Sequence, residues 1–200
     1  FFDSVVAQSE TSWDVFKCTN LNQKAAQSTV PDGASYDVVI YGGTPAGVAA
    51  ARSAAQLGKS VLLLSESGLF GGSISNGVSA TDLGALESSV GLANTYLADL
   101  KRFYHTDSYR TEPKVAECIF LNWLDTDKIT LETETNLETA NTNSGLITDI
   151  TFHTSSKPNL NINVQGKTFI DASYAGDLMF VSGVKTRRGM SDYYRYGENV

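Results

Sequence analysis

Apolar residues in the first half of the chain follow the order of a strand, a helix and a second strand. Residues 36–41 are apolar on both faces of the expected strand, as a central parallel strand should be. Small, helix-compatible residues continue from Pro45 to Leu57, and Gly58 then ends the expected helix. Residues 61–64 form a second continuous apolar run. The pattern therefore predicts a βαβ unit and an α/β fold.

Two further helices and then a change of period follow. Residues 93–104 and 113–124 carry apolar residues at helical spacing. From Ile129 onwards apolar and polar residues alternate, which predicts an antiparallel β-meander over about 129–165. A short apolar run at 168–171 then predicts a return to the parallel core.

These elements divide the chain into two expected parts. Residues 1–35 form an N-terminal arm with few periodic signals, and Trp13, Val15 and Phe16 are its candidate anchors to the main body. Residues 36–200 form a Rossmann-like domain whose parallel sheet carries the inserted meander.

The composition narrows the classes of function. Hydrophobic residues make up 42% and charged residues 18% of the 200 residues, which is typical of a globular protein. A net charge of −7 leaves no basic face for nucleic acid. No apolar run approaches the roughly 20 residues that span a bilayer. Segments rich in Ser, Thr and Asn and poor in Lys are common in secreted proteins, and a soluble cytoplasmic location is the alternative.

Two cysteines, Cys18 and Cys118, leave two interpretations open. They form a disulfide if the compartment is oxidising. Our preferred interpretation is two unpaired residues that act as small hydrophobes. The cysteines, His105 and His153 lack the spacing of metal ligands, so we expect no metal site.

A glycine-rich turn, residues 42–47, joins the first strand to its helix. Gly42 and Gly47 fill the first and third glycine positions of the dinucleotide-binding fingerprint G-x-G-x-x-G. Thr44 stands at the second position, where the backbone approaches a pyrophosphate closely. The alternative is a tight turn that only allows close packing of helix and strand. The order of strand, turn, small-residue helix and strand favours a dinucleotide site.

The second strand ends where a ribose-binding carboxylate is expected, roughly 20 positions after the turn. Ser65 occupies that position and Glu66 follows it. A serine hydroxyl would bind the ribose more weakly, and a solvated loop residue is the alternative role for Glu66. Residues 68–77 then form a long glycine-rich loop, which is typical of a functional segment in a compact domain.

Three ordered motifs resemble the FAD-dependent oxidoreductases of the glutathione-reductase-like superfamily. Residues 41–47 read YGGTPAG, residues 71–84 contain GGS and DLG, and residues 169–178 read FIDASYAGDL. More narrowly, the chain resembles the group whose first loop reads GGTPAG, in which threonine at the second glycine position is usual. The resemblance implies FAD as the cofactor and leaves the substrate open.

The resemblance also implies a role for each matched position. The pyrophosphate would lie on the first turn, the adenosine ribose at Ser65 or Glu66, and the adenine against the backbone of Leu137. The ribityl chain and flavin would pass the glycine-rich loop. Asp177 matches an aspartate of the second FAD motif, and a helix N-cap is its alternative role. The expected cofactor-binding residues are Gly42, Gly43, Thr44, Pro45, Ala46, Ser65, Glu66, Gly71, Gly72, Ser73, Leu137 and Asp177.

Two local departures from the family pattern are visible. Ser65 replaces the more usual acidic residue, and residues 187–190 differ from the Gly-Arg-Glu that relatives tend to carry there. Relatives also continue into a substrate domain. The resemblance therefore implies one part of a larger flavoprotein, completed by a C-terminal part or by a second polypeptide.

The expected function is transfer of a hydride from a small organic molecule to the flavin. An NAD(P)-binding dehydrogenase domain and a non-catalytic flavin-binding subunit are the alternatives. The sequence indicates no catalytic acid or base, because no motif distinguishes the available side chains. Those side chains are Tyr104, His105, Tyr174, Tyr193 and Tyr194.

Overall fold

The strand β1 (Ala34–Tyr41) lies near the middle of a mixed sheet. The computed structural model describes residues 16, 30–78, 89–106 and 110–186. In this part of the chain, six strands are hydrogen-bonded in the order β3-β2-β1-β6-β5-β4. The fold is thus α/β with a Rossmann-like core, as the sequence predicts.

The strands β2 (Val61–Leu64), β3 (Ile129–Glu132) and the last part of β6 (Lys157–Asp171) complete the parallel half of the sheet. Tyr41, the last residue of β1, is paired with the last residues of both β2 and β6. These carboxyl ends are therefore level, and the loops that follow them meet at one edge of the sheet.

β3 differs from the prediction, which placed its residues in the meander. It pairs in parallel with β2, and the meander begins only at β4 (Thr135–Asn143). Between the two strands Glu134 adopts a left-handed conformation with φ of 53°. The apolar alternation continues through this break, so period alone could not separate a parallel strand from an antiparallel one.

The meander and the parallel sheet share one long strand. β5 (Leu146–Thr154) pairs antiparallel with β4 and with the first part of β6. The last part of β6 pairs in parallel with β1. The sequence predicts a meander that ends near residue 165 and a separate run at 168–171, whereas a single strand covers residues 157–171. The division of the chain at residue 35 stays a prediction.

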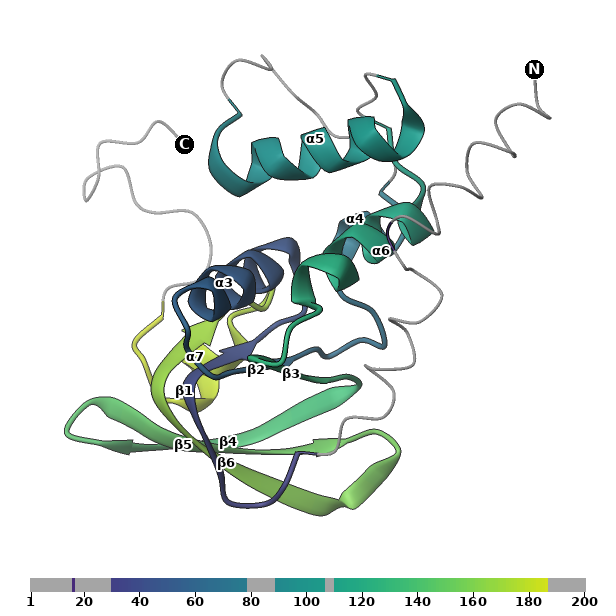
Figure 1. Ribbon diagram of the computed structural model, residues 1–200. Helices are drawn as coiled ribbons and strands as arrows, with labels where there is room; N and C mark the ends of the chain where they lie inside the picture. The colour runs from purple at the N-terminus through teal and green to yellow at the C-terminus, as the bar shows by residue number, and fades with distance from the viewer. Residues whose placement is uncertain (1–15, 17–29, 79–88, 107–109, 187–200) are drawn as a thin grey trace, which may run out of the picture.

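Three helices lie on one side of the parallel strands: α3 (Pro45–Gln56), α5 (Gly91–Tyr104) and α6 (Pro113–Leu124), with α5 packed on α6. Figure 1 shows them on the side of the parallel strands that faces away from the meander. Ile40 and Leu63 are fully buried beneath them. None of the helices in the described residues is long and apolar enough to cross a membrane.

The other face of the parallel strands packs against the meander and α7 (Asp177–Val181). Val39 and Leu62 point to this side, whereas their neighbours Ile40 and Leu63 point to the helices. Adjacent residues thus enter two different cores, because successive side chains of a strand face opposite ways. This explains why the central strands are continuously apolar.

Phe16 anchors the N-terminal arm against α5 and α6. Its side chain is buried and its ring centroid lies 5.8 Å from that of Phe103. The amide nitrogen of Asn122 donates to the Phe16 carbonyl oxygen at 3.2 Å. The expectation of an anchor at Phe16 is confirmed, whereas Trp13 and Val15 lie outside the described residues.

Cys118 of α6 is disulfide-bonded. Our preference for unpaired cysteines is therefore wrong for this residue. Cys18, the other cysteine of the sequence, lies outside the described residues. Cys118 is buried, which is compatible with a disulfide and with an unpaired thiol. The hydrophobic pattern therefore could not distinguish these two interpretations.

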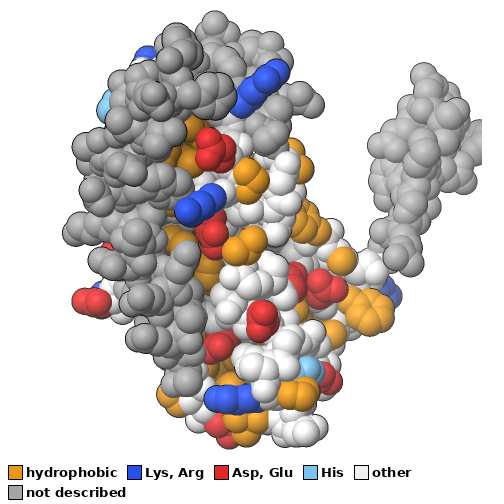
Figure 2. Space-filling view, turned by 90° about the vertical axis from the view of Figure 1, so that its right-hand side faces the viewer, with side chains coloured by type: hydrophobic (Ala, Val, Ile, Leu, Met, Phe, Trp, Pro, Cys, Tyr) orange, Lys and Arg blue, Asp and Glu red, His pale blue; other side chains and the backbone are white. Residues whose placement is uncertain are grey.

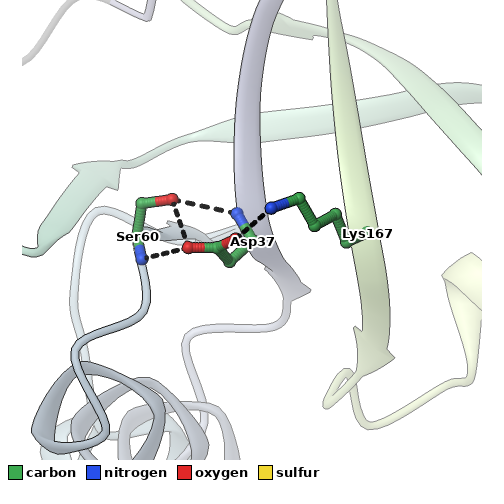
Figure 3. A network of polar contacts seen from close by, with 3 residues as sticks. All are labelled: Asp37, Ser60 and Lys167. Carbon is green, nitrogen blue, oxygen red and sulfur yellow. Dashed lines mark hydrogen bonds and ion pairs between the residues drawn. The ribbon is translucent and has the colours of Figure 1, made fainter.

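A polar network closes the amino ends of three parallel strands (Figure 3). Asp37 of β1 accepts hydrogen bonds from the backbone nitrogen of Ser60, at 3.0 Å, and from its hydroxyl, at 3.1 Å. The other carboxylate oxygen is 2.7 Å from the ammonium of Lys167 on β6. These contacts hold the pKa of Asp37 well below its usual range, with the Lys167 hydrogen bond as the largest cause.

Candidate functional site

The candidate site lies at the opposite end of the same strands, where β1 and β6 finish side by side. The chain leaves β1 toward β2 and β3 on one side, and it returns through β6 on the other side. Ligands of open α/β sheets bind at such a point of reversal, outside the carboxyl ends of the strands. The backbone nitrogen of Ala172 donates to the Tyr41 carbonyl at 2.7 Å and holds the two strand ends together.

The turn after β1 requires glycine at three positions. Gly42 has φ of 119°, and a Cβ there would collide with the backbone of Ala172. A Cβ at Gly47 would collide with the carbonyl oxygen of Gly42, and one at Gly43 with the Ser65 hydroxyl. The glycines therefore let helix, strand and loop approach each other closely, which is the packing role considered as the alternative from sequence.

Thr44 keeps the start of α3 open although it replaces a glycine. It is the helix N-cap, and its hydroxyl oxygen accepts from the backbone nitrogen of Gly47 at 3.2 Å. The same hydroxyl donates to the Ala172 carbonyl at 2.8 Å, so the side chain is turned toward β6. Within the described residues, the backbone N–H groups of Thr44 and Ala46 have no hydrogen-bond acceptor. Free N–H groups at a helix start favour an anion.

A pocket of about 430 Å³ lies beside this helix start. It collects residues from four segments that are far apart in sequence: the turn after β1, the end of β2, the glycine-rich loop and the loop after β6. Its lining residues are Gly43, Thr44, Ser65, Glu66, Ser67, Gly72, Ser73, Asn76, Tyr174, Ala175 and Asp177. Seven of these belong to the predicted cofactor-binding set: Gly43, Thr44, Ser65, Glu66, Gly72, Ser73 and Asp177.

The structure separates the roles of Ser65 and Glu66. Ser65 is 1% exposed, and its hydroxyl donates to the Leu69 carbonyl at 2.9 Å. Its backbone oxygen accepts from both the backbone nitrogen and the hydroxyl of Thr135. Ser65 therefore holds the loop to the sheet. The exposed Glu66 has no hydrogen bond or ion pair in the described part of the chain, which leaves its carboxylate available to a ligand.

Asp177 is likewise available. It is the first residue of α7, and Gly176 is the N-cap. The hydroxyl of Ser173 accepts from the backbone nitrogens of both residues, at 3.0 Å from Gly176 and 2.9 Å from Asp177. The alternative role of Asp177 as an N-cap is therefore wrong. Its carboxylate makes no hydrogen bond or ion pair with a described residue, and Asp177 lines the pocket together with Glu66.

Negative charge around this end of the sheet affects the pKa of Tyr41. Burial raises the pKa of Tyr41 to about 12, and the carboxylates of Glu66, Asp177 and Asp171 contribute. Figure 2, which shows the right-hand side of the view in Figure 1, has acidic side chains scattered over it and only isolated basic ones among the coloured residues. The described lining of the pocket contains no Lys or Arg, so an anionic ligand there would rely on backbone N–H groups.

Close packing within the protein requires two of the glycines in the glycine-rich loop. Gly71 is the N-cap of the one-turn helix α4 (Gly72–Ser75), and a Cβ there would collide with the Phe120 ring and the Ser75 hydroxyl. A Cβ at Gly72 would collide with the hydroxyl of Tyr174. Each fit is needed whether or not a cofactor passes nearby. Asp82 and Gly84 of the same predicted loop lie outside the described residues.

Five predicted residues lie outside the pocket lining. Gly42, Pro45, Ala46 and Gly71 belong to the same turns but do not line the pocket itself. Leu137 lies on β4, half buried and paired with Phe152, and it is also outside the lining.

Sequence reasoning assigned no cofactor-binding role to four pocket residues, Ser67, Asn76, Tyr174 and Ala175, although Tyr174 was among the generic acid–base candidates. The Asn76 side chain donates to the Gly72 carbonyl at 3.1 Å. Tyr174 contacts Ser73 across 101 positions of sequence. Such long-range contacts leave no periodic signal. The other generic candidates do not gather here: Tyr104 and His105 end α5, and Tyr193 and Tyr194 lie outside the described residues.

A second pocket, of about 320 Å³, is almost wholly apolar. It lies between α3, α4, α5 and α6, and Tyr96 and Phe120 stack in its wall with ring centroids 5.0 Å apart. Pro45 and Ala46 belong to this lining. The helix start therefore separates a polar pocket from an apolar one. The described residues contain no group of three or more potential metal ligands.

Comparison with known proteins places this geometry in context. The FAD dependent oxidoreductase family matches residues 37–200. A comparison with curated proteins finds no match. Among solved structures, a geranylgeranyl bacteriochlorophyll reductase-like protein from Thermoplasma acidophilum has a TM-score of 0.55 at 17% identity, over 76% of this chain and 43% of that chain.

Two further solved structures have the same fold. The flavin-dependent brominase Bmp2 has a TM-score of 0.56 at 13% identity, over 75% of this chain and 41% of that chain. The L-amino acid deaminase from Proteus vulgaris has a TM-score of 0.52 at 11% identity, over 76% of this chain and 56% of that chain. The chain therefore spans less than two thirds of the length of these proteins.

The family match favours FAD over the NAD(P) alternative, and the residues at the strand ends suit such a cofactor. Free N–H groups at a helix start can bind its pyrophosphate, and the two free carboxylates can bind its hydroxyl groups. With a match that covers residues 37–200, this chain belongs to the FAD dependent oxidoreductase family.

Proposed function

We propose that the chain is the FAD-binding part of an oxidoreductase and that FAD lies in the pocket at the carboxyl ends of β1, β2 and β6. The observation that carries this proposal is the pair of free N–H groups, of Thr44 and Ala46, between two uncommitted carboxylates. β1 lies between β2 and β6, so Glu66 and Asp177 flank the start of α3. A dinucleotide needs such an order of hydroxyl, phosphate and hydroxyl sites.

Different residues of the pocket then bind different parts of FAD. The backbone N–H groups and the dipole of α3 bind the pyrophosphate, which needs no basic side chain. Glu66 accepts hydrogen bonds from the adenosine ribose, in preference to the committed Ser65. Asp177 accepts from a hydroxyl of the ribityl chain, which runs past Gly72 and Ser73. The backbone of Leu137 remains the proposed contact of the adenine.

When bound, FAD supplies the redox chemistry and takes a hydride from a small organic substrate. The residues described here bind and orient the cofactor. We assign no catalytic acid or base among the pocket side chains, and further polypeptide would complete the reacting face of the flavin. Reoxidation by oxygen or by another acceptor is compatible with this arrangement.

We also propose that further polypeptide, either C-terminal or separate, completes the enzyme. The solved structures of this fold are longer, and this chain covers 41% to 56% of three of them. The surface of α7 supports the same proposal: Phe180 is 77% exposed and Val184 just after the helix 54%. Large apolar side chains together on a surface are typical of a contact site.

A secreted location is proposed from the disulfide of Cys118. Disulfides persist in oxidising compartments and are rare in the cytosol. Mass spectrometry of the alkylated protein, with and without prior reduction, tests this. We expect a protected Cys118 in the protein as isolated from its natural source. Complete labelling of Cys118 without reduction would contradict the proposal.

Competitive binding tests the cofactor assignment. The full-length protein should bind FAD more tightly than FMN, because FMN lacks the adenosine that Glu66 contacts. NAD+ in large excess should not displace the FAD. A protein that is folded by circular dichroism but binds NAD+ and not FAD would overturn the proposed function. Flavin that binds but is reduced by no substrate or reductant would instead support the non-catalytic subunit.

A further inference from the structure

Tyr174 joins two walls of the proposed FAD pocket. Its phenolic oxygen accepts a hydrogen bond from the backbone nitrogen of Ser73 at 2.8 Å. The same hydroxyl donates to the Ser73 side chain at 3.1 Å. One wall is the start of α4, and the other is the loop between β6 and α7. These contacts link segments that are 101 positions apart in sequence.

The hydroxyl of Tyr174 acts as the hydrogen-bond acceptor that the N-terminus of α4 lacks. Gly71, the N-cap of α4, has no side chain to accept the free N–H groups of the first turn. Tyr174 satisfies one of them from a distant part of the chain. Gly72 makes room for it, since a Cβ at this position would collide with the hydroxyl and lie 3.0 Å from the ring carbon that carries it.

The loop that presents Tyr174 is held firmly. Asp171 accepts from the backbone nitrogen and hydroxyl of Ser173, at 3.0 and 2.7 Å, and from the backbone nitrogen of Met179 at 2.8 Å. The carbonyl of Ala172 accepts from the Thr44 hydroxyl. The loop is thus tied both to α7 and to the start of α3. Tyr174 of this loop reaches outward and is 71% exposed.

An exposed ring whose hydroxyl is hydrogen-bonded contributes little buried surface to the stability of the fold. It contributes a fixed flat surface to the lining of the pocket, beside Glu66 and Asp177. Hydrogen bonds across an open pocket also set the distance between its walls. Both properties matter to a ligand that must touch α4 and Asp177 at once.

We propose that Tyr174 is a positioning residue for the cofactor. It spans the pocket from the β6–α7 loop to α4, fixes Ser73 and Asp177 relative to each other, and offers its ring to the ribityl–pyrophosphate portion of FAD. This inference rests on the proposed function. It differs from a catalytic role, because the hydroxyl is engaged with Ser73 and acts through the walls of the pocket.

Equilibrium binding of FAD to variants of the full-length protein tests the proposal. Tyr174→Phe keeps the ring and removes both hydrogen bonds, so we expect about fivefold weaker binding, equivalent to one net hydrogen bond. Tyr174→Ala removes the ring as well, and we expect about thirtyfold weaker binding. The bound flavin of both variants should be more fluorescent, because its surroundings are less fixed.

Tyr104→Phe is the matched control. The Tyr104 hydroxyl also accepts from a backbone nitrogen at a helix start, that of Glu112 at 2.9 Å, but outside the pocket lining. This variant should bind FAD as the wild type does. A double-mutant cycle of Gly72→Ala with Tyr174→Ala adds a second test, since removal of the phenol relieves the collision at Gly72. The two losses of affinity should therefore sum to more than the loss in the double variant.

The outcomes separate the two proposals. A wild-type protein that binds no FAD contradicts the proposed function. A wild type that binds FAD, together with Tyr174→Phe of equal affinity, overturns the role of Tyr174 alone. A fall in the melting temperature of Tyr174→Phe without any change in FAD affinity would show a merely structural contact and would also overturn it.

Discussion

Carboxylates are bound by other residues at one end of the parallel strands and face a pocket at the other end. At the amino ends, Asp37 is bound by Ser60 and Lys167, and every contact is internal to the protein. At the carboxyl ends, Glu66 and Asp177 face a pocket with no partner among the described residues. The same residue type therefore stabilises the fold at one end and remains available for a ligand at the other.

This difference follows from how the strands are connected. At the amino ends, the loop before β2 brings Ser60 directly onto Asp37 (Figure 3). At the carboxyl ends, β1 is followed by a helix whose N–H groups point into the space above the sheet. Binding groups left unsatisfied by the protein gather where the chain reverses direction. We therefore expect substitutions at the carboxyl ends to change ligand binding and substitutions at the amino ends to change stability.

The largest expected effect is at the turn after β1. Gly42→Ala adds a Cβ that collides with the Ala172 backbone and forces an alanine to φ of 119°. We expect a loss of roughly 2–4 kcal/mol of unfolding free energy. Gly58→Ala is the matched control, because Gly58 also has positive φ, 75°, but open space around it. It should lose about 1 kcal/mol. Chemical denaturation measures both, and equal losses would contradict the close packing at Gly42.

The next effect concerns the free carboxylates. Glu66→Gln and Asp177→Asn should each weaken FAD binding about tenfold or more, as expected for hydrogen bonds to a charged group. Neither should lower the melting temperature, because neither carboxylate has a partner in the described structure. Asp37→Asn is the control at the other end of the strands, and it should leave FAD affinity unchanged. Fluorescence titration measures the FAD affinities. Weaker binding by Asp37→Asn, with wild-type binding by Glu66→Gln and Asp177→Asn, would contradict the comparison.

The smallest effect is the pH dependence of Asp37. Its folded pKa lies below the usual 3.8, so its contribution to stability is complete above that value and is lost as the pH falls further. Lys167, whose pKa the same pair raises, loses its contribution only at strongly alkaline pH. We therefore expect wild type and Asp37→Asn to differ in melting temperature at pH 7 and to converge in acid. A difference that does not shrink as the pH falls below 3.8 would contradict this account.

Local elements were predictable from the sequence because their signals are local. The run 36–41, the helix from Pro45 and the glycines of the first turn each depend on neighbours within a few residues, and the structure contains all of them. The α/β class followed from their order, and the FAD assignment followed from the resemblance of three motifs to a known family. The pocket also gathers most of the residues that the family resemblance implied.

Pairing and long-range contacts were not predictable in the same way. An alternating pattern gives the faces of a strand but not the direction of its partner, so β3 was assigned to the meander. Glu134, which separates β3 from β4, is not a residue type that signals a left-handed turn. Tyr174 contacts Ser73 across the pocket, and Ser173 takes the capping role considered for Asp177. These depend on the folded arrangement of distant segments.

Hydrogen–deuterium exchange of the full-length protein with and without FAD tests the central claim most directly, because it reports on both ends of the strands at once. The account predicts that FAD slows exchange in peptides covering 42–47, 65–76 and 173–177, while peptides around Ser60 and Lys167 are unchanged. Protection around Ser60 and Lys167, with none at the start of α3, would contradict the assignment of the cofactor to the carboxyl ends.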